Sequence, residues 1–137
     1  MRGVLVDAGP LVALVNRDDG YHARCVRVLQ GLRGPLVTAW PVVSEAMHLL
    51  GDVRDGQHAL WEMLRSGGVA LAELGSGDLA RMQELMRKYS DLPMDLADAA
   101  LVRLAEREIL QDVLTVDGDF GIYRIAGRRR FRVVPLA

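Results

Sequence analysis

The chain has 137 residues, and its 17 basic and 18 acidic side chains leave a formal net charge of −1. This length predicts one domain, residues 1–137, with enough apolar residues for a sizeable core. The charge excludes the overall basic field of many nucleic-acid-binding domains, so any contact with nucleic acid has to be local. A single cysteine, Cys25, excludes an intramolecular disulfide and a multi-cysteine zinc site.

The N-terminal region reads as part of the fold rather than as a targeting segment. Asp7 and the Gly9-Pro10 pair interrupt its first apolar stretch, so the pattern of a signal peptide is missing. No apolar run approaches the length of a membrane span. We therefore expect a cytoplasmic protein without membrane contacts.

Short β-branched runs alternate with longer segments of helical periodicity along the chain. The runs predict strands over Gly3–Val6, Pro35–Thr38, Val69–Leu71, Val113–Val116 and Phe131–Pro135. Helices are predicted over Pro10–Val15, His22–Leu32, Pro41–Leu50, Gly56–Arg65, Asp78–Lys88 and Leu96–Glu108, with a short helix after Asp119. This alternation is typical of right-handed crossovers and a mostly parallel sheet, so the fold class is a three-layer α/β/α sandwich.

The first strand, in the stretch VLVDAGPLVAL, ends in a carboxylate. A buried carboxylate such as Asp7 costs several kcal/mol unless it is paired, protonated or bound to a metal. The nearest basic residues along the chain are Arg2 and Arg17, and neither is adjacent. Parallel sheets bind ligands beyond the carboxyl ends of their strands, so Asp7 lies where a site is expected. Its partner has to come from elsewhere in the fold.

Two further acids fall near the same predicted edge of the sheet. Asp117 ends the fourth predicted strand in LTVDGDF, although an Asp-Gly turn explains this residue equally well. Glu45 lies on the helix after the second strand, where it shares an edge with Val42 and Leu49 and so borders the core. A boundary glutamate that reaches for solvent is the alternative for Glu45.

The stretch DLPMDLADAALVRLAERE contains two aspartates on different sides of one helix. With about 3.6 residues per turn, Asp98 lies at the edge of the apolar stripe centred near Ala97 and Leu104, whereas Asp95 lies on nearly the opposite side. We therefore expect Asp98 to point inward. Asp95 is interpreted as the N-cap of this helix, with a ligand role as the alternative.

Together these observations predict Asp7, Glu45, Asp98 and Asp117 at one end of the sheet. Clustered carboxylates repel one another and raise their own pKa values unless a cation is present. Mg²⁺ and Mn²⁺ are the natural cations, because hard divalent ions prefer oxygen ligands. The three histidines are scattered and there is one lysine, which is a poor set for acid–base catalysis without a metal.

The stretches VLVDAGPLVAL, VVSEAMHLL, DLADAALVRLAE and LTVDGDFGIYR together resemble the PIN-domain ribonucleases, above all the small VapC-type toxins. The resemblance implies a five-stranded parallel sheet and Mg²⁺- or Mn²⁺-dependent cleavage of single-stranded or loop RNA. It implies that Asp7, Glu45, Asp98 and Asp117 are the catalytic and metal-binding quartet, with Asp119 as an accessory acid. In such enzymes one or two ions activate a water for in-line attack on a phosphodiester.

One departure from the family pattern concerns the contact with phosphate. Many relatives carry Ser or Thr just after the first aspartate, but Ala8 and Gly9 stand there in this chain. Thr115 is the residue expected to supply a hydroxyl to the substrate instead.

The stretch GRRRFRVV is the most basic part of the chain. If it enters the last strand without a break, Arg130 and Arg132 share one face while Phe131 and Val133 share the other. The two arginines are then candidates for substrate binding, with a solvated sheet edge as the alternative.

The predicted role is the toxin of a toxin–antitoxin pair, which implies an RNA substrate and an antitoxin protein as partners. The resemblance also implies a homodimer. A housekeeping RNA-processing nuclease and a catalytically silent PIN module that only binds RNA or protein are the alternatives. A phosphatase is disfavoured because Gly9 stands where its signature needs a second aspartate. A phospho-receiver is disfavoured because it needs a lysine at the end of a late strand, whereas Lys88, the only lysine, lies in a predicted helix.

Overall fold

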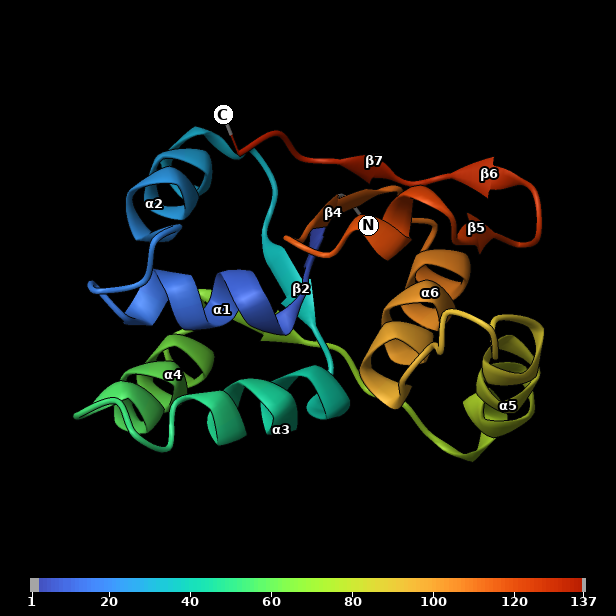
Figure 1. Ribbon diagram of the computed structural model, residues 1–137, viewed down its shortest axis with the longest axis horizontal. Coiled ribbons are helices and arrows are strands. Elements are labelled where there is room, and N and C mark those ends of the chain that lie inside the picture. The colour runs from blue at the N-terminus through green and yellow to red at the C-terminus, as the bar shows by residue number, and fades with distance from the viewer. Residues whose placement is uncertain (1–2, 137) are drawn as a thin grey trace.

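The computed structural model describes residues 3–136. Five parallel strands form one sheet in the order β3-β2-β1-β4-β7 (Figure 1). These strands are β1 (Val4–Val6), β2 (Leu36–Thr38), β3 (Val69–Leu71), β4 (Asp112–Leu114) and β7 (Arg132–Val133). Each begins within one residue of its predicted start, so the predicted parallel sheet of five strands is confirmed.

Helices connect the strands and cover the sheet. They are α1 (Ala8–Val15), α2 (His22–Gly31), α3 (Trp40–Leu49), α4 (Gly56–Arg65), α5 (Leu79–Lys88) and α6 (Leu96–Glu108). Figure 1 shows α1 to α4 on one side of the sheet and α5 and α6 on the other, which confirms the three-layer arrangement. The short helix predicted after Asp119 is a 3₁₀ turn over Gly118–Gly121. Among the described residues, every helix is too short or too polar to cross a membrane.

The strand order reverses between β1 and β4. Leu5 pairs with Val113 and Val6 with Leu114 in this parallel ladder. The backbone N–H of Asp7 then donates to the carbonyl of Leu114 at 3.0 Å. The carboxyl ends of β1 and β4 therefore meet at a topological switch point, where open α/β sheets bind ligands.

The last part of the chain contains a hairpin that the sequence analysis missed. Strands β5 (Arg124–Ile125) and β6 (Arg129–Arg130) form a separate antiparallel pair before β7. The turn between them passes through Ala126 and Gly127, whose φ angles are 53° and 72°. Such left-handed backbone reverses the chain within a few residues, which the strand periodicity could not indicate.

The hairpin overturns the predicted arrangement of the two arginines. Arg130 belongs to β6 and Arg132 to β7, so they do not share one face of one strand. Phe131 between them is buried against Phe120, with ring centroids 5.3 Å apart, but Val133 is 44% exposed instead of packed. The prediction failed because the chain changes sheets at Phe131.

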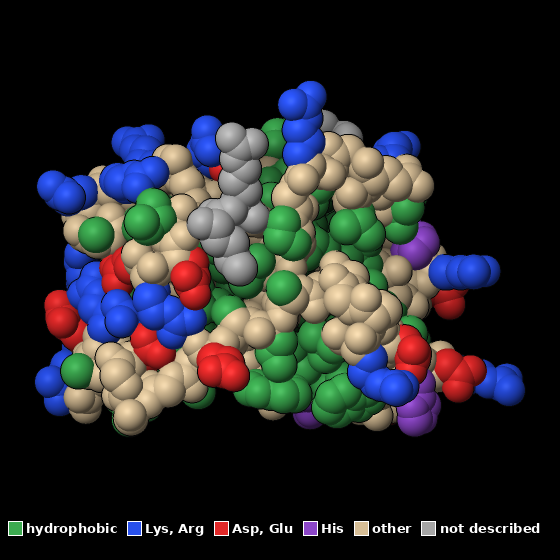
Figure 2. Space-filling view, turned by 180° about the vertical axis from the view of Figure 1, so that it is seen from behind, with side chains coloured by type: hydrophobic (Ala, Val, Ile, Leu, Met, Phe, Trp, Pro, Cys, Tyr) green, Lys and Arg blue, Asp and Glu red, His purple; other side chains and the backbone are tan. Residues whose placement is uncertain are grey.

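Arginines of α5 and α6 are held in ion pairs. Arg103 and Arg107 donate to the buried carboxylate of Asp78 at 2.7 and 2.9 Å, and Arg81 donates to Glu106 at 2.7 Å. Figure 2 shows basic and acidic side chains interspersed at the end of the molecule where these helices lie. These arginines therefore hold the two helices together, and they do not form a continuous basic surface.

The residue that follows the last turn of α6 has an unusual conformation. Ile109 adopts a left-handed conformation, with φ of 55° and ψ of 52°, and its side chain is 76% exposed. Glycine is common at this position of a helix, whereas a β-branched residue there pays a steric cost of about 1–2 kcal/mol. The fold accepts this cost without gaining much burial from the side chain.

Ile109→Gly should stabilise the protein by about 0.5–1 kcal/mol, because relief of the steric cost exceeds the entropy that glycine loses on folding. Urea unfolding of the variant and wild type measures the change. Ile109→Ala keeps the Cβ atom and should gain less. A destabilised Ile109→Gly protein would mean that the exposed side chain makes a stabilising contact.

Candidate metal centre

Three aspartates from distant parts of the chain meet at the carboxyl edge of the sheet. Asp7 follows β1, Asp98 lies in the first turn of α6, and Asp117 follows β4. One carboxylate oxygen of each lies within 4.8 Å of those of the other two. We call Asp7, Asp98 and Asp117 the aspartate cluster. The structure thus brings together three of the four acids that the sequence analysis expected to meet.

Asp7 is fixed by hydrogen bonds to both of its carboxylate oxygens. Oδ1 accepts from the backbone N–H of Ala8 at 2.8 Å, and Oδ2 accepts from the hydroxyl of Thr115 at 2.8 Å. Burial raises the pKa of Asp7, although these two hydrogen bonds act in the opposite direction. The protein therefore fixes the orientation of this carboxylate, while burial makes its ionised form less favourable.

Thr115 lies at the cluster, but its hydroxyl is already used inside the protein. It donates to Asp7 and accepts from the backbone N–H of Asp117 at 2.9 Å, and the side chain is buried. The predicted contact with substrate would therefore require the hydroxyl to give up its bond to Asp7, because its only proton points there. Gly9 has no side chain to offer a hydroxyl. A serine or threonine there would be too close to Val116, because a Cβ atom at this position would lie 2.8 Å from its Cγ2.

Asp98 points inward, as its helical angle predicted, and is only 6% exposed. Its Oδ2 accepts a hydrogen bond from the hydroxyl of Tyr123 at 2.9 Å. Burial, together with the negative charge of Asp95, raises the pKa of Asp98 to about 7, while the hydrogen bond from Tyr123 lowers it. Asp98 is thus the most strongly perturbed carboxylate of the cluster.

Tyr123 is a residue of the site that the sequence did not indicate. Its ring is fully buried between Phe120 and Tyr89, with ring centroids 5.1 and 5.0 Å away. Burial and the bond to Asp98 raise the pKa of Tyr123, so it stays a hydrogen-bond donor. Its position follows from the 3₁₀ turn after Asp117, and no residue pattern in the sequence indicated it.

The raised pKa of Asp98 predicts how stability depends on pH when EDTA keeps metal away. Between the ordinary value of 3.8 and about 7, the folded protein keeps a proton that the unfolded chain has lost. Raising the pH through this window therefore destabilises wild type, by at most about 1.4 kcal/mol for each pH unit. Asp98→Asn does not titrate there, so its stability relative to wild type should rise with pH. A difference that stays constant in urea melts from pH 4 to 8 would contradict the raised pKa.

Asp117 forms an Asp-Gly turn and also belongs to the aspartate cluster. Its Oδ1 accepts from the backbone N–H of Asp119 at 2.9 Å, which is the Asp-Gly turn considered as the alternative. With this turn formed, one carboxylate oxygen of Asp117 still lies within 4.8 Å of oxygens of Asp7 and Asp98. Asp119 is half-buried and lies next to the aspartate cluster without belonging to it.

Glu45 lies at the margin of the site. Its side chain is exposed on α3, whose buried residues include Val43 rather than the predicted Leu49. Partial burial and the charges of Asp95 and the aspartate cluster still raise the pKa of Glu45. The charge of the aspartate cluster therefore affects the pKa of Glu45, but Glu45 adds no carboxylate oxygen to the cluster in this arrangement.

Asp95 is the N-cap of α6, which confirms the preferred interpretation. Its Oδ1 accepts from the backbone N–H of Asp98 at 2.8 Å, and its side chain is exposed. Asp95 lines a shallow surface hollow with Trp40, Glu45 and His48. It thus lies beside the aspartate cluster and acts on Asp98 through its charge.

The structure does not bring Arg130 and Arg132 to the aspartate cluster. Arg132 pairs in register with Asp112, the first residue of β4, whereas Asp117 lies beyond the last residue of that strand. Since β4 and β7 are parallel, Arg132 lies at the amino edge of the sheet. Arg130 precedes it in β6, so both arginines lie away from the predicted site.

Comparisons with known proteins agree with this geometry. The family model described as PIN domain matches residues 4–127. Ribonuclease VapC26 of Mycobacterium tuberculosis is 29% identical over 135 residues, which cover 96% of this chain and all of the relative.

Two solved structures share the fold. The crystal structure of VapC20 of Mycobacterium tuberculosis, described as a toxin that cleaves the sarcin-ricin loop, superposes with a TM-score of 0.79 at 19% identity, covering 87% of this chain and 93% of that one. The crystal structure of VapBC2 of Rickettsia felis bound to a DNA fragment from its promoter gives a TM-score of 0.66 at 11% identity, covering 97% and 98%.

Proposed function

Since this chain belongs to the PIN domain family, we propose that it is a cytoplasmic endoribonuclease that requires Mg²⁺ or Mn²⁺ and serves as the toxin of a toxin–antitoxin pair. The observation that carries the proposal is the aspartate cluster at the switch point of the sheet. The similarity to Ribonuclease VapC26 and to VapC20, a toxin that cleaves the sarcin-ricin loop, supports it.

The donor set of the aspartate cluster fits a hard divalent cation. All three ligand atoms are carboxylate oxygens, which Mg²⁺ and Mn²⁺ prefer. Within residues 3–136, the ion pairs involve none of these three aspartates. A cation held by Asp7, Asp98 and Asp117 would offset the burial and repulsion that raise the pKa values of Asp7 and Asp98.

The residues around the aspartate cluster prepare it for catalysis. Thr115 and Tyr123 hold one oxygen each of Asp7 and Asp98, so these carboxylates need little reorganisation. An ion held by the three aspartates would supply an acidified water and would stabilise charge on the phosphate.

The two remaining acids are proposed to act at the margin of the site. The raised pKa of Glu45 and its exposure suit it to accept a proton from water on the substrate side. We propose Asp119, which follows Asp117 in the same turn, as an accessory acid at the rim.

We propose two protein partners besides the RNA substrate. One is an antitoxin, because a solved relative of the same fold is a VapBC complex. The other is a second copy of the chain, as the family resemblance implies. A gene for a small DNA-binding protein beside the gene for this chain would favour the toxin over a housekeeping nuclease, and size-exclusion chromatography with light scattering tests the dimer.

The proposed function predicts RNA cleavage that depends on metal. Purified protein should cleave an RNA pool in Mg²⁺ or Mn²⁺, and excess EDTA should abolish the reaction until metal is restored. Cleavage that persists in EDTA at full rate would reject the metal mechanism. Intact RNA under all conditions, with folded protein, would favour the silent module that only binds.

A further inference from the structure

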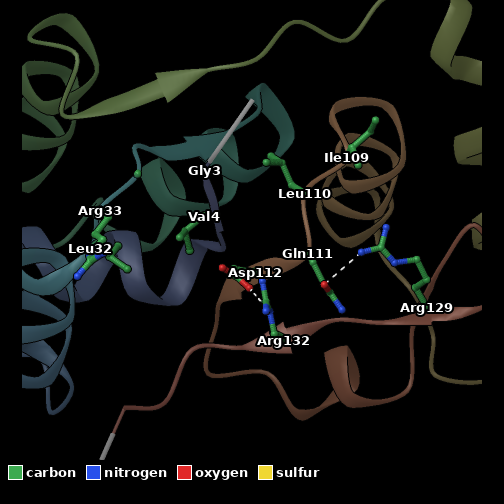
Figure 3. A pocket seen from close by; sticks show the side chains of 11 residues that line it. Gly3, Val4, Leu32, Arg33, Ile109, Leu110, Gln111, Asp112, Arg129 and Arg132 are labelled. Atoms are coloured by element: carbon green, nitrogen blue, oxygen red, sulfur yellow. Dashed lines mark hydrogen bonds and ion pairs between the residues drawn. The ribbon is translucent and has the colours of Figure 1, made fainter.

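A second polar hollow lies at the amino edge of the sheet, opposite the aspartate cluster. It encloses about 420 Å³ between the start of β1, the loop before β2, the end of α6 and the start of β7. Its charged lining comes from Arg33, Arg129, Arg132 and Asp112 (Figure 3). We call this feature the arginine hollow.

The arginine hollow has an excess of positive charge. Three arginines are among its lining residues, against one aspartate, Asp112. Figure 3 shows Arg33 on one side, Arg129 on the other and the Asp112–Arg132 pair between them. Arg33, Arg129 and Arg132 are all exposed, so an incoming ligand can reach them.

Two of the arginines are oriented by neighbours that leave most of their donors available. Nε of Arg132 donates to Asp112 at 2.7 Å, and one terminal nitrogen of Arg129 donates to the side-chain oxygen of Gln111 at 3.1 Å. A guanidinium carries five N–H donors, so each contact uses a small part of the set. Partly fixed guanidinium groups with spare donors match phosphate oxygens, which accept paired N–H···O bonds.

The position of the arginine hollow places it within reach of a substrate bound at the aspartate cluster. The two sites lie at opposite ends of α6, with Asp98 in its first turn and Ile109 just past its last residue, so at 1.5 Å per residue they are about 16 Å apart. A folded RNA is wider than this and presents phosphates on several sides, which proteins contact largely by shape and backbone. One RNA molecule can therefore touch both edges.

We propose that the arginine hollow is a second RNA-binding site, which takes backbone phosphates of a folded substrate away from the bond that is cut. The proposal rests on the proposed ribonuclease function. It gives a role to the arginine-rich stretch that the geometry separates from the catalytic edge. It also predicts that the enzyme prefers folded RNA over short single strands.

The test measures binding of a folded RNA stem-loop by fluorescence anisotropy in the Asp98→Asn background, which keeps the RNA intact. Arg33→Gln with Arg129→Gln should weaken binding about 10-fold or more and reduce the slope of log affinity against log salt by about 1.5–2. The control is Arg17→Gln with Arg87→Gln, which removes the same charge from exposed residues outside the arginine hollow. It should bind within about twofold of the parent.

The outcomes separate this proposal from the proposed function. If the arginine variant binds RNA like the control while wild type cleaves RNA, the second site is wrong and the ribonuclease stands. If wild type fails to cleave RNA but the arginine variant loses RNA affinity, the ribonuclease is wrong and the RNA site stands. Loss of affinity for duplex DNA of equal length, with RNA affinity unchanged, would overturn the RNA site in favour of a DNA contact.

Discussion

Asp98→Asn should abolish RNA cleavage, whereas Asp95→Asn should keep most of it. Asp98 is buried and contributes an oxygen to the aspartate cluster, so we expect a loss beyond the roughly 10–100-fold typical of residues that only support a metal ligand. Asp95 is exposed and caps α6 through the backbone N–H of Asp98. Asparagine caps a helix as well as aspartate does, so the Asp95 variant should fold normally.

The two substitutions also differ in their electrostatic effect. Removal of the negative charge of Asp95 lowers the pKa of Asp98, which favours its ionised form. Initial rates of RNA cleavage at saturating Mn²⁺, with circular dichroism as the folding control, measure both variants. Complete loss of activity in both folded variants would mean that Asp95 is a ligand and that the cap is a minor role.

The sequence predicted the parts of the site that depend on local periodicity. Asp7 was placed at the end of a buried strand, and the angle of Asp98 on its helix placed it inward; the structure agrees with both. These predictions worked because strand ends and helical faces are properties of a few neighbouring residues. The parallel order of the strands then brought the two carboxylates to one edge.

The parts that failed depend on contacts between distant segments. The bond of Thr115 to Asp7 joins residues 108 positions apart, and Tyr123 reaches Asp98 across 25 positions. Glu45 is exposed because α3 buries Val43 instead of Leu49. The packing of whole helices and strands decides such contacts, so local patterns in a single sequence could not predict them.

Asp7→Asn should leave the metal-free protein as stable as wild type or more so, and should remove most of its response to metal. Burial raises the pKa of Asp7, so the charged form at neutral pH costs folding energy that a neutral amide avoids. The amide oxygen of the variant would keep the bond from Ala8, and the Thr115 hydroxyl can accept from the new amide nitrogen. The variant would still lack the charge that attracts a divalent cation.

Thermal melts of wild type and Asp7→Asn, with and without Mn²⁺, test most directly whether the aspartate cluster holds a metal ion. Wild type should gain about 2.7 kcal/mol when free Mn²⁺ is 100 times its dissociation constant, and the variant should gain much less at the same concentration. Equal gains in both proteins, together with an Asp7→Asn protein that is several kcal/mol less stable without metal, would contradict the account. Asp7 would then be a structural hydrogen-bonding residue.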